Sequence, residues 1–102
     1  MIHVIALIEV TPGRRDDFLA KFRDLVPKVR AEKGCLEYGP TVDLPSTLTA
    51  QTPVGDHLVV VVEKWDSVQA LEDHLAAPHV LAYRQTVEDI VVDVTIHVLE
   101  PV

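Results

Sequence analysis

Two stretches of the chain are apolar at almost every position, and they constrain the fold more than any other feature. Residues 2–10 (IHVIALIEV) and 58–65 (LVVVVEKW) consist mainly of β-branched and aliphatic side chains. A strand with one wet face alternates apolar and polar residues, so these two patterns predict strands that are covered on both faces. A chain of 102 residues holds only one modest core and gains stability by sharing apolar surface with a partner. We therefore expect this chain to form an oligomer.

An amphipathic helix is predicted between the two apolar strands. Thr11 followed by Pro12 indicates its start, because a hydroxyl can cap a helix and proline is tolerated at the first helical position. Pro27 falls inside the pattern and predicts a bend near residues 23–27, and Lys33-Gly34 indicates the end. The apolar residues that recur on one helical face are Phe18, Leu19, Phe22, Leu25, Val26 and Val29.

The remaining segments predict two more strands and two helical pieces. Residues 35–42 form the expected second strand, and the Pro-, Thr- and Ser-containing residues 43–57 form a long loop. After the strand at 58–65, Asp66 or Ser67 should cap a helix that runs to about Ala76, and Pro78 should start a further piece at 78–88. Residues 91–99 alternate and predict a last strand, in which Val92, Val94, Ile96 and Val98 form the drier side.

This order of elements is β-α-β-β-α-β, the arrangement of the ferredoxin-like α+β fold. No linker or repeat divides the chain, so residues 1–102 are expected to form a single domain. The fold has a four-stranded antiparallel sheet with its helices on one face, which leaves the other face bare. Because the strands at 2–10 and 58–65 are apolar on both faces, we expect a homodimer in which the bare sheet faces pack together.

The composition excludes several function classes. Nine Lys and Arg against 16 Asp and Glu give a net charge of −7, which disfavours a nucleic acid partner. The longest aliphatic run, residues 58–62, is too short to cross a membrane, and residues 1–10 lack the basic start of a signal peptide. A lone Cys35 is compatible with a cytoplasmic location. The four glycines do not have the spacing of a dinucleotide or phosphate loop.

The polar and aromatic residues that stand out fall in one segment. Alternation places Glu63 and Trp65 on the same face of their strand, and His79 and Tyr83 are four residues apart on one helical face. Together they could line a cavity with an aromatic wall and with imidazoles that move protons near neutral pH. Trp65 can also be explained as an ordinary core residue, and the two histidines as a helix cap and a surface residue. The spacing of the histidines does not match a metal site. The candidate residues are Glu63, Trp65, His74, His79, Tyr83 and Arg84.

Three runs of the sequence resemble a known family. These are PGRRDDFLAKF after the first apolar strand, then EKGCLEY, then VVVVEKWDSVQALEDHLAAPHV, in which a His follows the Trp by nine residues and APH comes next. In this order they are similar to the antibiotic biosynthesis monooxygenase family, which includes quinol monooxygenases and forms dimeric α+β barrels. The resemblance covers nearly the whole chain. It implies that small aromatic phenols or hydroquinones are oxidised to quinones by dioxygen, without a metal, flavin or other cofactor.

The resemblance also implies roles for the candidate residues. Trp65 would hold the aromatic substrate, and His74 or His79 would be the base, oriented by Glu63. Tyr83 or Arg84 would bind a substrate oxygen. The chain contains no Asn, although characterised members are similar in using an Asn beside the Trp and His. The alternative function is a dimeric barrel that binds a small hydrophobic metabolite without turning it over, or that isomerises it.

Overall fold

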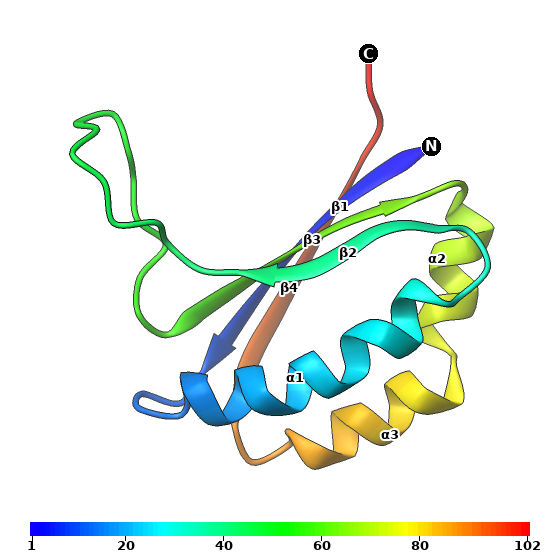
Figure 1. The fold of residues 1–102 in the computed structure, drawn as a ribbon, viewed down its shortest axis with the longest axis horizontal. Helices are drawn as coiled ribbons and strands as arrows, with labels where there is room; N and C mark the ends of the chain where they lie inside the picture. The colour runs from blue at the N-terminus through cyan, green and yellow to red at the C-terminus, as the bar shows by residue number, and fades with distance from the viewer.

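The computed structural model describes residues 1–102 and contains one four-stranded sheet with three helices packed on it (Figure 1). All strand pairs are antiparallel, and the strand order is β2-β3-β1-β4. This confirms the predicted ferredoxin-like α+β fold, with the second helix in two pieces. The elements are β1 (Ile2–Val10), α1 (Arg15–Arg30), β2 (Cys35–Thr41), β3 (Leu58–Trp65), α2 (Val68–Leu75), α3 (Pro78–Thr86) and β4 (Val91–Leu99).

The core lies between the sheet and the helices. Every second residue of β1 and β3 is buried on this side, and the six apolar residues predicted for one face of α1 are all buried against them. The helical periodicity of α1 and the alternation of β1 and β3 thus place these apolar side chains in a single layer. Trp65, Phe18 and Phe22 are the largest of the fully buried side chains.

The predicted start of α1 is wrong by three residues. The helix begins at Arg15, and Thr11 instead belongs to a turn in which Gly13 has φ +83°. The Thr11 hydroxyl donates a hydrogen bond to the Ile90 carbonyl at 3.2 Å, so it ties the end of β1 to the start of β4 and does not cap the helix. At the other end α1 stops at Arg30, and Pro27 lies on its exposed side.

The break between α2 and α3 occurs where the sequence predicts it. Ser67 caps α2, because its Oγ accepts a hydrogen bond from the Ala70 N–H at 3.1 Å. Pro78 occupies the start of α3, where its missing N–H has no helical partner to lose. The last helical residue is Thr86, two residues before the predicted end.

The apolar side of the last strand is more exposed to solvent than its alternating sequence predicts. Val94 and Ile96 pair with Ile8 and Ala6 of β1 and face the same side of the sheet, but each remains almost half exposed. The register of the β1–β4 pairing shifts between Glu9 and Val10, and Val10 pairs with Val91. Val92 therefore has no partner in β1 and does not continue the predicted apolar side of the strand. The edge strand therefore presents apolar side chains that the helices of its own chain leave uncovered.

No helix covers the opposite face of the sheet (Figure 1). Its centre is apolar and only half-buried, and consists of Ile5, Leu7, Val60 and Val62. Residues 42–57 form neither helix nor strand, which confirms the predicted loop, and they project from the ends of β2 and β3. None of the three helices is long and apolar enough to pass through a bilayer.

Candidate functional site

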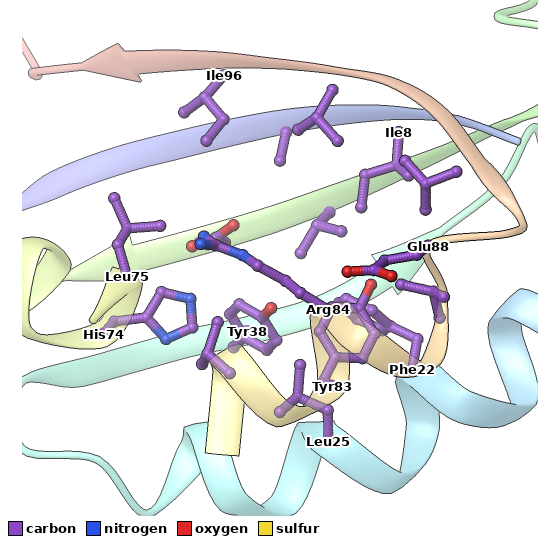
Figure 2. Close-up of a pocket in the computed structure, with 17 residues that line it drawn as sticks. Ile8, Phe22, Leu25, Tyr38, His74, Leu75, Tyr83, Arg84, Glu88 and Ile96 are labelled. Carbon is purple, nitrogen blue, oxygen red and sulfur yellow. The ribbon is translucent and has the colours of Figure 1, made fainter. Parts of the chain in front are cut away.

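A cavity of about 350 Å³ lies between the sheet and the helices, on the side of the uncovered strand β4. Thirteen of the 17 residues that line it are hydrophobic. Its volume is at the lower end of the range of small-molecule sites, about 300–1,000 Å³. Figure 2 shows that His74 from α2, Tyr83 and Arg84 from α3, and Tyr38 from β2 point into this space. A few polar groups thus converge inside an apolar hollow.

Glu63 is a buried carboxyl on the sheet side of the cavity. The Trp65 indole N–H donates a hydrogen bond to its Oε1 at 2.9 Å, which keeps the two β3 side chains together. Burial raises the pKa of Glu63 to about 7, the nearby charge of Glu32 adds to this rise, and the Trp65 hydrogen bond opposes it. The carboxyl can therefore hold or release a proton near neutral pH.

Replacement of Glu63 by Gln is expected to change how stability depends on pH. In the unfolded chain this carboxyl ionises near its ordinary value of 4.5. Between that pH and about 7 the native state keeps a proton that the unfolded state has lost, so stability falls as the pH rises. The wild type should lose about 3 kcal/mol relative to E63Q between about pH 4 and about pH 8. Urea denaturation of both proteins across this range tests it, and parallel stability curves would contradict it.

His74 is the imidazole that reaches the cavity. It lies near the end of α2 and is buried beside Trp65, with ring centroids 4.7 Å apart, and beside Tyr38, at 5.4 Å. Its Nδ1 lies 3.0 and 3.1 Å from the two oxygens of Glu32. Burial lowers the pKa of His74, and the Glu32 carboxylate opposes that effect. The ring is therefore neutral near pH 7 and can accept a proton.

Glu32 also binds the second histidine. His79, at the start of α3, places Nε2 2.7 Å from Glu32 Oε2, so one carboxylate bridges the two imidazoles. The Glu32 side chain is only 13% exposed, against 28% for His79. Each imidazole is hydrogen-bonded to Glu32. No group of His, Cys, Asp and Glu residues in the chain has the arrangement of a metal site.

A glycine holds the turn that carries Glu32. Gly34 has φ +86°, and a Cβ built on it would lie 2.6 Å from the Ala70 Cβ of α2. Its carbonyl accepts a hydrogen bond from the Asp66 N–H at 2.9 Å. Only a residue without a side chain allows the turn between α1 and β2 to approach α2 this closely.

Gly34→Ala is therefore expected to destabilise the protein by about 2–5 kcal/mol, from a left-handed backbone and an overpacked contact together. Gly13→Ala is the matched control. Gly13 has almost the same φ, +83°, but a Cβ there meets nothing within 4 Å, so the loss should be only about 1–2 kcal/mol. Chemical denaturation of both variants measures the difference. Equal losses would show that the contact with Ala70 has no influence.

The aromatic wall of the cavity consists of Phe22, Tyr38 and Tyr83. Phe22 stacks on Tyr38 with ring centroids 5.6 Å apart and meets Tyr83 edge to face at 5.7 Å. Burial raises the pKa of both tyrosines above the usual value, so their hydroxyls stay protonated and can donate hydrogen bonds. An aromatic ligand would find apolar ring faces and hydroxyl donors on this side.

The six residues selected from the sequence occupy different parts of this region. Glu63, His74, Tyr83 and Arg84 line the cavity. Trp65 is fully buried behind His74 and does not line the cavity, and His79 lies in an outer groove between α1 and α3. Sequence reasoning missed Glu32 and Tyr38, although both stand in the run EKGCLEY that carries part of the resemblance. The available signal for Glu32 was a carboxylate two residues before the turn glycine Gly34.

Comparisons with known proteins agree on one family. The family model described as antibiotic biosynthesis monooxygenase matches residues 1–86. The chain is 38% identical over 103 residues to the protein called probable quinol monooxygenase YgiN of Escherichia coli, covering 99% of this chain and 98% of that protein.

Solved structures give the same result. A crystal structure of a Pseudomonas aeruginosa protein has a TM-score of 0.80 and 30% identity and covers 99% of this chain and 93% of that one. A structure titled antibiotic biosynthesis monooxygenase has a TM-score of 0.80 and 28% identity and covers 100% and 99% of the two chains.

Proposed function

Because the chain belongs to the antibiotic biosynthesis monooxygenase family, we propose that it oxidises a small aromatic phenol or quinol with dioxygen. The observation that carries this proposal is the placement of His74, a neutral imidazole on the wall of an apolar cavity. The cavity volume and the aromatic wall suit a small ring system. The name of the Escherichia coli relative, probable quinol monooxygenase, supports the same substrate class.

The proposed first step is removal of a proton from the substrate hydroxyl. His74 Nε2 makes no hydrogen bond within the chain. Every fully buried side-chain nitrogen or oxygen has a partner, so Nε2 is not fully buried. Because His74 lines the cavity, Nε2 faces the cavity. It accepts the proton of a phenol that lies against Phe22 and Tyr38. The phenolate is more electron-rich than the phenol and passes electrons to dioxygen.

The overall reaction balances without another reductant. A phenol and dioxygen give a quinone and water: one oxygen atom enters the ring, and the other leaves as water with the hydroxyl hydrogen and a ring hydrogen. A quinol treated in the same way gives a hydroxyquinone and water. The imidazolium of His74 returns its proton to the reduced oxygen atom that becomes water.

Tyr83 and Arg84 supply the groups that would hold the negative charge of the substrate. Both line the cavity and come from consecutive positions on α3. A hydroxyl and a guanidinium donate to a phenolate oxygen more strongly than to the neutral hydroxyl, so they stabilise the ionised form. The apolar surroundings strengthen each of these contacts.

Oxygen uptake tests the proposal. The protein is mixed with a panel of phenols, benzoquinols and naphthoquinols in the presence of a chelator, and uptake is compared with that of heat-denatured protein. Glu72→Gln, an exposed change on α2, is the variant control. We expect uptake above the denatured blank, and one labelled oxygen atom in the product when the gas is ¹⁸O₂.

Uptake equal to the blank across the panel, for compounds that bind to the cavity, would contradict the proposal. It would favour the alternative in which the barrel binds a small hydrophobic metabolite or isomerises it. A product without labelled oxygen would rule out monooxygenation.

We also propose that the bare sheet face pairs with the same face of a second copy. Ile5, Leu7, Val60 and Val62 form an apolar centre there that no helix covers. Light scattering should give twice the chain mass. Val60→Lys, which puts a charge at the centre of this face, should give a folded monomer. A wild-type monomer at micromolar concentration would contradict the pairing.

A further inference from the structure

We propose that Glu32 is the positioning residue for the base His74, and that His79 controls its effect by binding the same carboxylate. This inference rests on the proposed function, because it assigns a role to residues around the base of that reaction. It is carried by the bridge itself, in which one carboxylate lies 3.0 Å from His74 Nδ1 and 2.7 Å from His79 Nε2.

Glu32 determines the tautomer of His74. A carboxylate only accepts hydrogen bonds, so Nδ1 must carry the proton that it donates to Glu32. The other nitrogen, Nε2, then has a free lone pair and faces the cavity, as a base requires. Without the carboxylate the neutral ring could place its proton on Nε2 and would then be unable to accept one from the substrate.

The negative charge of Glu32 favours the protonated form of His74. When His74 takes up a proton, the positive ring lies next to the negative Glu32 in a largely buried position, where the attraction is weakly screened. Other titratable groups act on or contact the same ring: His79 and Arg84 from α3 and Tyr38 from β2. Glu63 from β3 lines the same cavity. A positive charge on His79 or Arg84 opposes protonation of His74.

The bridge connects the cavity with the outer surface of the protein. Glu32 comes from the turn after α1, His74 from α2 and His79 from α3, so the bridge joins three separate elements. His74 faces the cavity, whereas His79 lines the outer groove beside Lys21 and Lys28. A change of charge at the outer surface can therefore reach the cavity base through one shared carboxylate.

Nuclear magnetic resonance of the ring nitrogens tests the inference in the protein without substrate. Spectra of His74→Gln identify the His74 signals. In the wild type, the neutral ring should carry its proton on Nδ1. Glu32→Gln, which keeps the shape but removes the charge, should lower the pKa of His74 by about one pH unit or more. His79→Gln should raise it. A merely structural role for Glu32 would not give shifts of opposite sign.

Two further variants complete the design. Glu72→Gln removes the same charge from an exposed position on α2 and should leave the pKa of His74 unchanged. Glu32→Asp keeps the charge at a greater distance and should place the pKa of His74 below that of the wild type, which keeps the test available if E32Q does not fold. A His74 that keeps its tautomer and its pKa in folded E32Q or E32D would overturn the proposal.

Kinetics separate this inference from the proposed function. If the protein is active, E32Q should lower kcat by up to about tenfold per pH unit of lost basicity, with little change in KM. The expected resonance shifts together with no oxygen uptake would refute the proposed function and leave the role of Glu32 intact. Oxygen uptake with unchanged resonances would refute the role of Glu32 alone.

Discussion

His74→Gln is expected to lower kcat by about 10²–10⁴-fold, the usual contribution of a positioned base. Gln fills a similar space but cannot accept a proton, whereas the wild-type Nε2 can take one from a bound hydroxyl in the cavity. Because the loss concerns proton transfer and not contact area, KM should change much less than kcat. Steady-state oxygen uptake with the best substrate of the panel measures both constants.

His57→Gln is the matched control for this variant. It makes the same exchange at an exposed position in the loop before β3, away from the cavity lining, and should leave kcat unchanged. Thermal unfolding of both variants checks that the fold is intact. A folded His74→Gln variant with at least half of the wild-type kcat would show that His74 is not the base.

Trp65→Ala is expected to destabilise the protein by about 3–5 kcal/mol, as for other buried large aromatic residues. The indole is fully buried, packs on His74 at 4.7 Å, and donates the hydrogen bond that Glu63 accepts. Its removal leaves a void and a buried carboxyl without its donor. Since a domain of this size is stable by only about 5–15 kcal/mol, urea denaturation at 25 °C should show a large shift in midpoint.

Two other variants separate the contributions to this loss. Trp65→Phe keeps most of the volume but loses the N–H, so it should cost about 1–3 kcal/mol. Val68→Ala, at a half-exposed position at the start of α2, should change stability by less than about 0.5 kcal/mol. If Trp65→Ala cost no more than Val68→Ala, the indole would not hold this part of the core together.

Sequence patterns predicted the layers of this fold because each rests on a short-range rule. The buried face of α1, the Ser67 cap and the Pro78 break all depend on residues within one or two helical turns. The predicted start of α1 is wrong because of a contact between distant residues. Thr11 has the chemistry of a cap, but its hydroxyl binds the Ile90 carbonyl, 79 residues away.

The site was predicted less completely, because its contacts join distant segments. The sequence suggested that Glu63 orients an imidazole, since both lie in one stretch of the chain. In the structure Glu63 binds the Trp65 indole, and the carboxylate beside His74 comes from Glu32, 42 residues earlier. The pairing depends on the close approach of Gly34 to α2, which periodicity does not encode.

Ionisation of a phenol bound in the cavity shows directly whether His74 removes a proton from the substrate. A nitrophenol serves as the probe, because it is too electron-poor to reduce dioxygen and its anion absorbs at a longer wavelength than the neutral form. The titration is carried out about one pH unit below the pKa of the free nitrophenol. The wild type should bind the probe as its anion, and His74→Gln should bind it as the neutral phenol. A probe that stays neutral when bound to the wild type would show that His74 does not take a proton from the substrate.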